Sequence, residues 1–365
     1  MTERGKAPFR ADHVGSLLRP RSLLELRARF DEGEVTAEAL RAHEDECIRQ
    51  AVAMQESVGL RGVTDGEYRR ESFHGDFIGR LEGVKFELRT PVASGGGAPF
   101  VAVVSDKMRR PAGGIEVENF RFLASVTTRT AKQTIPSPTM THFRGGREAI
   151  DEAAYPTLDE FFADLARVYT EEVFGLYEAG CRYLQLDDTN LAYLCDERVR
   201  ARVRERGEDV ERLPSDYARL INASIQGRAD DLSVCVHLCR GNARSRWFAE
   251  GGYEPVAEII FNEIDVDGFF LEYDDERSGD FSPLRFVPKD KMIVLGLLTS
   301  KRGDLEDRDE IKRRIDEAAR YIPLEQLCLS PQCGFASAAA GNLLSEDDQR
   351  AKLALIVEIA EEVWG

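Results

Sequence analysis

An imidazole and a thiol lie two residues apart at the end of an apolar run. The run 234–238 contains His237 and is followed at once by Cys239. Residues two apart on a strand point to the same side, so these side chains would face one partner together. Imidazole nitrogen and thiolate sulfur are both common ligands of Zn²⁺. The pair therefore provides half of a zinc site, and Glu272 and Cys333 are the candidates for the other half.

The candidate ligands are far apart in the sequence, and this spacing indicates the kind of site. Glu272 follows the apolar run 267–271, and Cys333 comes shortly after the run 326–329. Structural zinc sites favour short knuckles in which two residues separate two cysteines, and the sequence contains none. Ligands from three separate strand ends instead predict a metal at the bottom of a substrate cleft.

The elements that must position these residues alternate between strands and helices. Strand-length runs are predicted at 7–15, 61–64, 131–135, 183–186, 234–238, 267–271, 292–297 and 326–329. Helical spacing is found at 20–30, 36–58, 158–179, 214–228, 255–264, 308–321 and 345–364. Eight strands, most followed by a helix, predict an α/β fold, a (βα)8 TIM barrel formed by residues 1–365 as a single domain.

Polar residues of catalytic type follow six of the eight predicted strands. They are His13, Ser16, Glu67, Asp187, His237, Cys239, Glu272 and Cys333. In a barrel the carboxyl ends of all strands meet at one rim, where the active sites of this fold lie. Eight residues from scattered segments are therefore expected to converge on one opening.

Residues 82–128 break this alternation. The stretches 85–88 and 100–104 alternate like antiparallel strands, and a glycine-rich link at 94–97 lies between them. We expect a β-hairpin insertion on the barrel. Its expected use is as a lid or as a contact in a homo-oligomer.

Composition limits the classes of partner. The 365 residues carry a formal net charge of -17, so a basic stripe for nucleic acid or for an anionic membrane is not expected. The N-terminus has no apolar signal region, and no run is long enough to span a membrane. Seven cysteines without the spacing of a small disulfide scaffold predict reduced thiols in the cytoplasm.

Five short segments together resemble a known family. They are 13–16 (HVGS), 65–67 (DGE), 186–188 (LDD), 237–239 (HLC) and 331–334 (PQCG). In this order and spacing they resemble the catalytic half of cobalamin-independent methionine synthase, and especially its short single-domain relatives, over essentially the whole chain. The resemblance implies a zinc-containing barrel in which four side chains bind the metal: His237, Cys239, Glu272 and Cys333.

The resemblance also implies a substrate. Ser16, Glu67 and Asp187, with His13 in the same first loop, would hold the amino-acid part of a thiol such as homocysteine. Zinc would keep the substrate sulfur as a thiolate that attacks a methyl or alkyl donor. Because the four-ligand site is already full, we expect Glu272, the hard ligand with a single contact, to move when the sulfur binds.

Two departures from the family pattern concern the donor. The family's Asp and His after the seventh strand are replaced in 296–301, where Lys301 stands roughly at the position of the His and is a candidate acid for the leaving group. The folate-stacking Trp after the third strand is missing from 138–143. His142, His74 and Arg70 are further candidates for donor contacts.

The leading interpretation is a zinc-dependent methyltransferase that forms methionine from homocysteine and methyl-folate or another methyl donor. One alternative is alkylation of a different thiol, such as coenzyme M, by an epoxide. Others are a zinc lyase or hydrolase that uses metal-bound water and a non-catalytic barrel with structural zinc. Glu67 and Asp187 favour a thiol that bears an ammonium group over a sulfonate, and two thiolates with a carboxylate make zinc a poor Lewis acid for hydrolysis.

Overall fold

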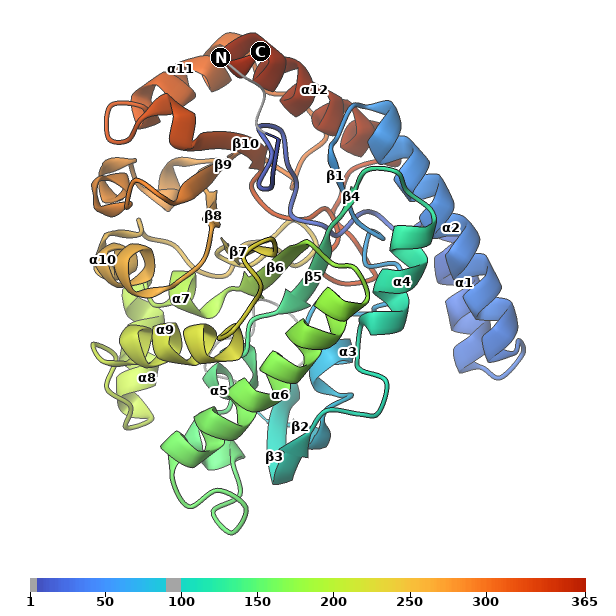
Figure 1. The fold of residues 1–365 in the computed structure, drawn as a ribbon, viewed down its shortest axis with the longest axis vertical. Helices are drawn as coiled ribbons and strands as arrows, with labels where there is room; N and C mark the ends of the chain where they lie inside the picture. Colours follow the sequence, from blue (N-terminus) through green and yellow to red (C-terminus); the bar gives the residue numbers. More distant parts are fainter. Residues whose placement is uncertain (1–4, 90–99) are drawn as a thin grey trace.

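The protein is a TIM barrel of the α/β class, as the sequence predicts. The computed structural model describes residues 5–89 and 100–365. Its parallel strands lie side by side in the middle of the molecule, and the longer helices lie around the outside (Figure 1). This arrangement brings the carboxyl ends of the strands together at one rim.

Six parallel strands form the continuous part of the barrel, in the order β10-β9-β8-β7-β6-β5. Their bounds are β5 Gln133–Pro136, β6 Tyr183–Asp188, β7 Ser233–Leu238, β8 Gly268–Glu272, β9 Met292–Leu298 and β10 Leu327–Pro331. Every residue of these strands is buried, which explains why they read as near-continuous apolar runs in the sequence. β1 (Gly62–Val63) pairs in parallel with β4 (Thr130–Ala131) next to this sheet.

The first predicted strand is less regular than expected. Of the range 7–15, only Ala11 forms a parallel bridge, to Leu329 on β10. The predicted strand 131–135 is divided at Lys132 into β4 and β5. The Lys132 ammonium donates to Asp12 Oδ1 at 3.0 Å inside the barrel. A buried ion pair thus connects the first segment to the third strand position.

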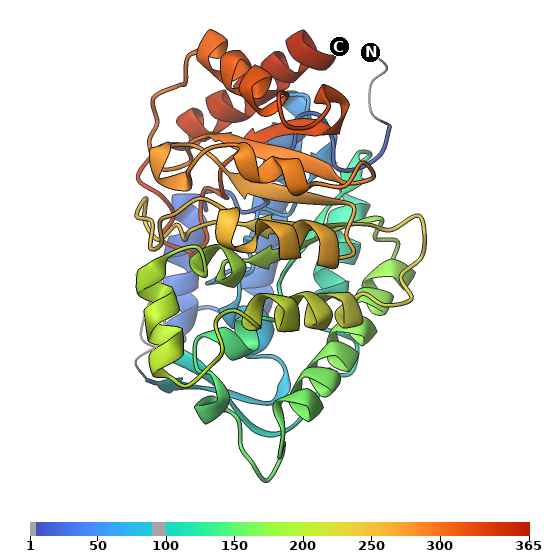
Figure 2. The same ribbon diagram turned by 90° about the vertical axis from the view of Figure 1, so that its left-hand side faces the viewer.

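The seven predicted helices all form. They are α1 Arg21–Asp31, α2 Ala37–Ser57, α6 Leu158–Glu178, α9 Leu213–Ser224, α10 Glu254–Glu263, α11 Arg308–Ala318 and α12 Glu346–Trp364. Thr36 and Ser345 accept hydrogen bonds from the first turns of α2 and α12, as N-caps do. Seen from the side, the yellow-green and orange helices of the second half lie one above another on the outside of the sheet (Figure 2).

Shorter helices that no periodic pattern predicts occupy the loops between these elements. The α-helical ones are α3 Gly75–Ile78, α5 Met140–Phe143, α7 Asn190–Tyr193 and α8 Glu197–Glu205. The 3₁₀ turns are η1 Arg147–Ala149, η2 Glu276–Ser278, η3 Ser282–Phe286 and η4 Leu324–Gln326. Three of the α-helical ones, α3, α5 and α7, are single turns that contain or adjoin residues of the site described below.

The hairpin insertion is confirmed, but it is shorter than predicted. β2 (Glu82–Leu88) and β3 (Phe100–Arg109) pair antiparallel, and both views show them far from the two chain termini. The predicted glycine link at 94–97 lies outside the described residues. The extension of this insertion through residue 128 was wrong, because Val117–Ser125 is the helix α4. Val117, Phe120 and Leu123 recur at helical spacing and are buried.

The core gives no sign of crosslinking or of a membrane span. All seven cysteines are buried, and none of them forms a disulfide within the described residues. Within residues 5–89 and 100–365, none of the helices is both long enough and apolar enough to cross a bilayer. That the chain forms one domain remains our prediction, and the continuous sheet supports it.

Candidate active site

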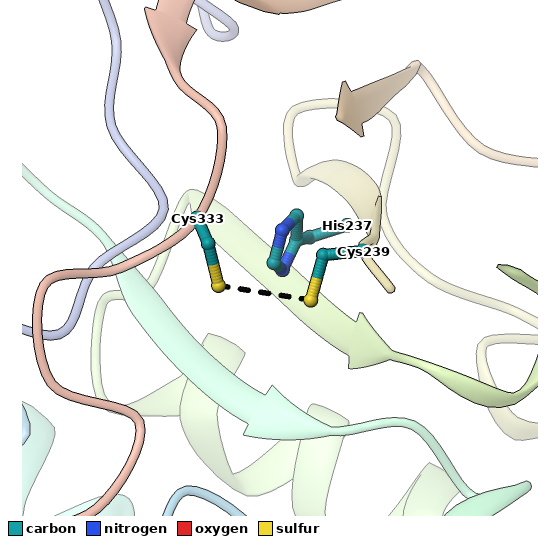
Figure 3. Close-up of side chains that lie close together, drawn as sticks. All are labelled: His237, Cys239 and Cys333. Carbon is teal, nitrogen blue, oxygen red and sulfur yellow. Dashed lines mark hydrogen bonds between the residues drawn. The ribbon is translucent and has the colours of Figure 1, made fainter. Parts of the chain in front are cut away.

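Two thiols and an imidazole meet at the carboxyl end of the barrel. His237 lies on β7, Cys239 follows that strand at once, and Cys333 lies two residues beyond β10. Their ligand atoms are all within 4.8 Å of one another, and the two sulfur atoms are 3.6 Å apart (Figure 3). All three side chains are buried. Parallel strands therefore bring together, from positions almost a hundred residues apart, three of the four side chains that were predicted as metal ligands.

The hydrogen bonding of His237 leaves one nitrogen available. Its Nδ1 lies 3.2 Å from Asp187 Oδ1, on the neighbouring strand β6. Its Nε2 is buried and has no hydrogen-bond partner among the described residues. A carboxylate on one ring nitrogen and a free second nitrogen is the arrangement of metal-binding histidines. The donor set therefore fits a soft or borderline divalent cation such as Zn²⁺.

Glu272 ends β8 near this cluster, but the structure does not bring its carboxylate into it. Oε2 accepts from the Arg240 backbone N–H at 2.5 Å, and Oε1 pairs with Arg277 and, at 3.4 Å, with Lys301. Burial alone would raise its pKa, but Lys301, Arg240 and Arg277 together lower the pKa of Glu272 to about 2. Its role as a fourth ligand stays a prediction.

A cavity of about 650 Å³ opens beside the three ligand atoms. Ser16, Glu67 and Asp187 line it together with His237, Cys239 and Cys333. Six of the nine residues predicted as metal ligands, substrate contacts or catalytic groups thus surround one space. They come from the first, second, fourth, fifth and eighth strand positions.

Glu67 reaches the cavity because its backbone takes an unusual conformation. Gly66 and Glu67 both have positive φ, +67° and +59°, in the turn after β1. A left-handed glutamate is uncommon and is found mostly where function holds the backbone. Oε1 accepts from Thr134 Oγ1 at 3.0 Å, whereas Oε2 is buried without a partner among the described residues.

The electrostatics of Glu67 indicate a site for a cation. Burial, which Arg70 opposes and Asp187 reinforces, raises the pKa of Glu67 to about 7. The hydrogen bonds of the Asp187 carboxylate within the described residues both involve Oδ1, with Gln185 and His237 as partners. Each carboxylate therefore has one oxygen left over, and a bound ammonium would satisfy both.

Ser16 and the turn after β10 fit closely together. A Cβ built on Gly334 would lie 1.9 Å from Ser16 Oγ, so only glycine allows this approach. Ser16 Oγ accepts a long hydrogen bond, 3.4 Å, from the Ala336 backbone N–H. Its own hydrogen remains available to an acceptor in the cavity.

Like Glu272, the predicted site residues His13 and Lys301 are not part of the cavity lining among the described residues. His13 is buried near Lys132, and burial together with that ammonium lowers the pKa of His13 to about 4. Lys301 is buried and donates to Asp274 Oδ2 at 2.7 Å as well as to Glu272. The substrate role of His13 and the acid role of Lys301 therefore stay predictions without a contact to the cavity.

Of the three residues predicted to contact the methyl donor, one lines the cavity and two are buried away from its lining. His74 lines the cavity, whereas His142 is buried with its Nδ1 2.8 Å from Tyr217 Oη. Arg70 is buried between Glu67 and Glu116 and orients the former. A cation that was not predicted, Arg144, lines the cavity just after the single-turn helix α5. No spacing rule singles it out, because a loop places it there.

Comparison with known proteins assigns the chain to a family. The catalytic domain of cobalamin-independent synthase matches residues 9–362. The protein YxjH of Bacillus subtilis, which is uncharacterised, is 47% identical over 98% of this chain and 96% of its own length.

Solved structures support the same family assignment. A Listeria monocytogenes protein, provisionally assigned as a vitamin-B12 independent methionine synthase, is 38% identical with a TM-score of 0.80, over 99% of this chain and all of its own. A B12-independent methionine synthase from Shewanella sp. W3-18-1 shares the fold, with 20% identity and a TM-score of 0.73 over 97% of both chains. The match over nearly the whole sequence means that the chain belongs to the family of cobalamin-independent methionine synthase catalytic domains.

Proposed function

We propose that the protein transfers a methyl group to the thiol of homocysteine, forming methionine, in a zinc-dependent reaction. One observation carries the proposal: His237, Cys239 and Cys333 form a soft-metal donor set that opens into the same cavity as Glu67 and Asp187. The first group suits a sulfur nucleophile, and the second suits the ammonium of an amino acid.

The three clustered side chains would hold the zinc ion. When bound there, zinc favours the thiolate over the thiol of a sulfur substrate and orients its lone pair. Asp187 fixes the His237 ring through Nδ1, so Nε2 is the nitrogen that faces the metal position. Glu272 could add a fourth ligand only by leaving Arg277 and Lys301.

The remaining polar groups would bind the amino-acid part of homocysteine. Glu67 Oε2 and the free oxygen of Asp187 accept from the ammonium, and the Ser16 hydroxyl donates to the carboxylate. The ammonium also relieves the repulsion between Glu67 and Asp187. A thiol that carries a sulfonate in place of this group, such as coenzyme M, would meet two carboxylates and is disfavoured.

The chemical step is a displacement at the methyl carbon. The sulfur electron pair forms the new S–CH₃ bond, the bond from the methyl carbon to the donor breaks, and its electron pair stays on the donor atom. That atom then takes up a proton. Lys301 is the proposed source of this proton, which would reach the donor atom either through solvent or directly. Two thiols in the ligand set keep the sulfur electron-rich and make hydrolysis by metal-bound water the weaker alternative.

The relatives support the reaction class. Several relatives that match over most of this chain are methionine synthases, for example that of Pyrococcus abyssi at 26% identity. The Shewanella structure was solved with selenomethionine, the selenium analogue of the product that we propose.

Thiol-dependent proton release tests the proposal. At pH 8 a free thiol with a pKa near about 8.5 is mostly protonated, so capture as a thiolate should release about 0.8 proton per homocysteine. Methionine, which has no thiol, should release none. Glu67 contributes little at this pH because it is already largely ionised.

Matched cysteine variants identify the metal site. C239A should lose stoichiometric zinc, measured by mass spectrometry of the metal, and should lose proton release with it. C235A is the control, because Cys235 lies on the same strand two residues before His237 but is buried in the barrel interior. A C239A protein that retains zinc, or a zinc-loaded wild type that releases no proton with homocysteine, would refute the proposed function.

A further inference from the structure

The two sulfur atoms of the metal-ligand cluster come from strands that are not neighbours. Cys239 follows β7 and Cys333 follows β10, and two other strands, β8 and β9, lie between them in the sheet. Three strand spacings of about 4.8 Å amount to about 14 Å along the sheet. The sulfur atoms nevertheless lie 3.6 Å apart, and Figure 3 shows them meeting from two different segments. The loops after the two strands must therefore close most of this distance.

The separation of the sulfur atoms suits one zinc ion. Two Zn–S bonds of about 2.3 Å at a tetrahedral angle hold their sulfur atoms about 3.8 Å apart. The 3.6 Å between Cys239 Sγ and Cys333 Sγ is close to this value. A zinc site at this place therefore needs the two loops held at about this distance, and the contacts between the loops decide how firmly they are held.

One buried amide connects the loops that carry the two cysteines. Asn242 comes three residues after Cys239. Its Nδ2 donates to the Gly334 carbonyl at 3.0 Å and to Ser300 Oγ at 3.1 Å, and Ser300 Oγ donates to the same carbonyl at 3.1 Å. Gly334 directly follows Cys333, and Ser300 lies in the loop after β9. Asn242, Ser300 and Gly334 thus form a loop clasp, which joins the loops after β7, β9 and β10 beside a ligand.

The partners of Asn242 fix the direction in which its amide points. The Gly334 carbonyl can only accept a hydrogen bond, so the NH₂ end of the amide must face it. Asn242 is 5% exposed, and its Oδ1 is buried without a partner in the described part of the chain. A buried acceptor without a donor is unfavourable, and an aliphatic side chain of the same size would avoid it. This indicates that asparagine stands here for its two N–H donors.

A second asparagine supports the loop clasp from outside. Asn342 Nδ2 donates to the Ser300 carbonyl at 2.7 Å, and its Oδ1 accepts from the Ser245 backbone N–H at 3.0 Å. Ser245 lies in the same loop as Asn242, where Arg244 and Ser245 have positive φ, 49° and 65°. Two consecutive left-handed residues without a glycine are strained. Contacts with the loops after β9 and β10 therefore hold this loop in a conformation that it would not keep alone.

We propose that Asn242 is a positioning residue of the metal centre, which holds the Cys333 loop against the Cys239 loop so that both sulfur atoms reach one ion. The inference rests on the proposed function, because it takes the ion to be zinc. Asn242 does not bind the ion but acts through the Gly334 carbonyl on the neighbouring cysteine. Without its amide the two sulfur atoms would sample wider separations, and metal binding would have to order the loop. The affinity for zinc would then fall while the ligands stay the same.

Zinc affinity, measured by competition with a chromophoric chelator, tests this role without any turnover. N242A should bind Zn²⁺ about tenfold or more weakly than wild type, and S300A, which removes part of the loop clasp, about threefold or more weakly. Q326A is the matched control. Gln326 is 7% exposed and precedes β10, and its Nε2 donates to the carbonyls of Pro288 and Lys291. Q326A removes the same kind of bonds at the other end of β10, so its zinc affinity should stay within about twofold of wild type.

Co²⁺ in place of Zn²⁺ distinguishes a residue that positions the ligands from one that is itself a ligand. The visible absorption of bound cobalt reports the type and geometry of its ligands. Saturated N242A should show the wild-type spectrum, but saturation should need a higher cobalt concentration. Urea unfolding in the presence of a chelator should show similar losses of stability for N242A and Q326A, because each variant loses two buried hydrogen bonds.

Two results would overturn the inference: zinc affinities of N242A and S300A within about twofold of wild type, or a cobalt spectrum of saturated N242A that differs from the wild-type spectrum. If N242A does not fold, S300A decides alone. Proton release with homocysteine, measured on zinc-saturated samples, keeps the two proposals apart. If wild type releases the proton but zinc affinity does not depend on Asn242, the positioning role is wrong while the thiol function stands. If zinc affinity depends on Asn242 but no proton is released, the positioning role stands and the thiol function fails.

Discussion

Replacing Glu67 with glutamine should make the metal-free protein more stable at alkaline pH and poorer at binding its substrate. Glu67 is 2% exposed, and Oε2 has no hydrogen-bond partner in the described residues. Burial, which Asp187 reinforces and Arg70 only partly offsets, raises its pKa from 4.5 to about 7. The ionised form of this side chain therefore costs the folded state free energy when no ammonium is bound.

The sign and size follow from linkage between protonation and folding. Below pH 4.5 the carboxyl is protonated in both the folded and the unfolded chain, so its titration costs nothing. As the pH rises towards 7, only the unfolded chain loses the proton, and stability is lost progressively. Above pH 7 the loss is complete, and a pKa difference between 4.5 and about 7 corresponds to about 3 kcal/mol. Glutamine does not titrate and escapes this loss.

Urea unfolding at pH 5, 6, 7 and 8, in the presence of a chelator, measures the effect. The E67Q protein should differ little from wild type at pH 5 and should gain up to about 3 kcal/mol at pH 8. E71Q is the control, because Glu71 lies on the same cavity but is exposed, and it should show no such trend. A stability difference that is independent of pH, or that shrinks as the pH rises, would refute the reasoning.

The same variant should fail in function. A neutral amide cannot balance the ammonium of homocysteine, so E67Q should bind homocysteine about 10- to 100-fold more weakly. Zinc content should stay at the wild-type level, because Glu67 lies outside the ligand cluster. A residue whose removal stabilises the fold and weakens binding is one that the fold retains for its ligand.

Three further predictions concern other parts of the chain. G334A should displace the Ser16 hydroxyl, because the new Cβ would lie 1.9 Å from its oxygen. In steady-state assays the variant should raise the KM for homocysteine roughly tenfold with little change in kcat. An unchanged KM would show that Ser16 does not belong to the substrate site. S345A should lower the free energy of unfolding by about 1 kcal/mol, measured by urea unfolding, with activity unchanged, because it removes the capping box of α12. If Lys301 delivers the proton, K301M should lower kcat without changing zinc content or homocysteine-dependent proton release. Loss of zinc in K301M would instead show that Lys301 acts by holding Glu272 in place.

Local sequence patterns were sufficient for most of the fold and for the core of the site. Every long helix could be predicted from its periodicity and its end signals, such as Thr36 before α2 and Gly180 after α6. The joint appearance of His237, Cys239 and Cys333 could be predicted because parallel barrel strands end at one rim. The helix α4 was missed because the alternation of the hairpin was carried on past β3.

The precise partners of charged side chains were beyond such patterns. Glu272 ends its strand as predicted, yet it faces Lys301 and Arg277, because loops after β8 and β9 bring these cations to it. His142 and Arg144 are two residues apart, and only the turn after α5 decides that the arginine lines the cavity while the histidine is buried against Tyr217.

The sequence by itself determined the barrel, its order of elements and the rim at which the reactive side chains gather, because strand and helix periodicity are local properties of the chain. Tertiary structure alone decided which carboxylate is paired with protein cations and which is left for a ligand. It also decided that the hairpin faces the cavity and that Arg144 stands there without an ion-pair partner among the described residues. These features depend on long-range distances between charges and on desolvation, which no local pattern of residues encodes.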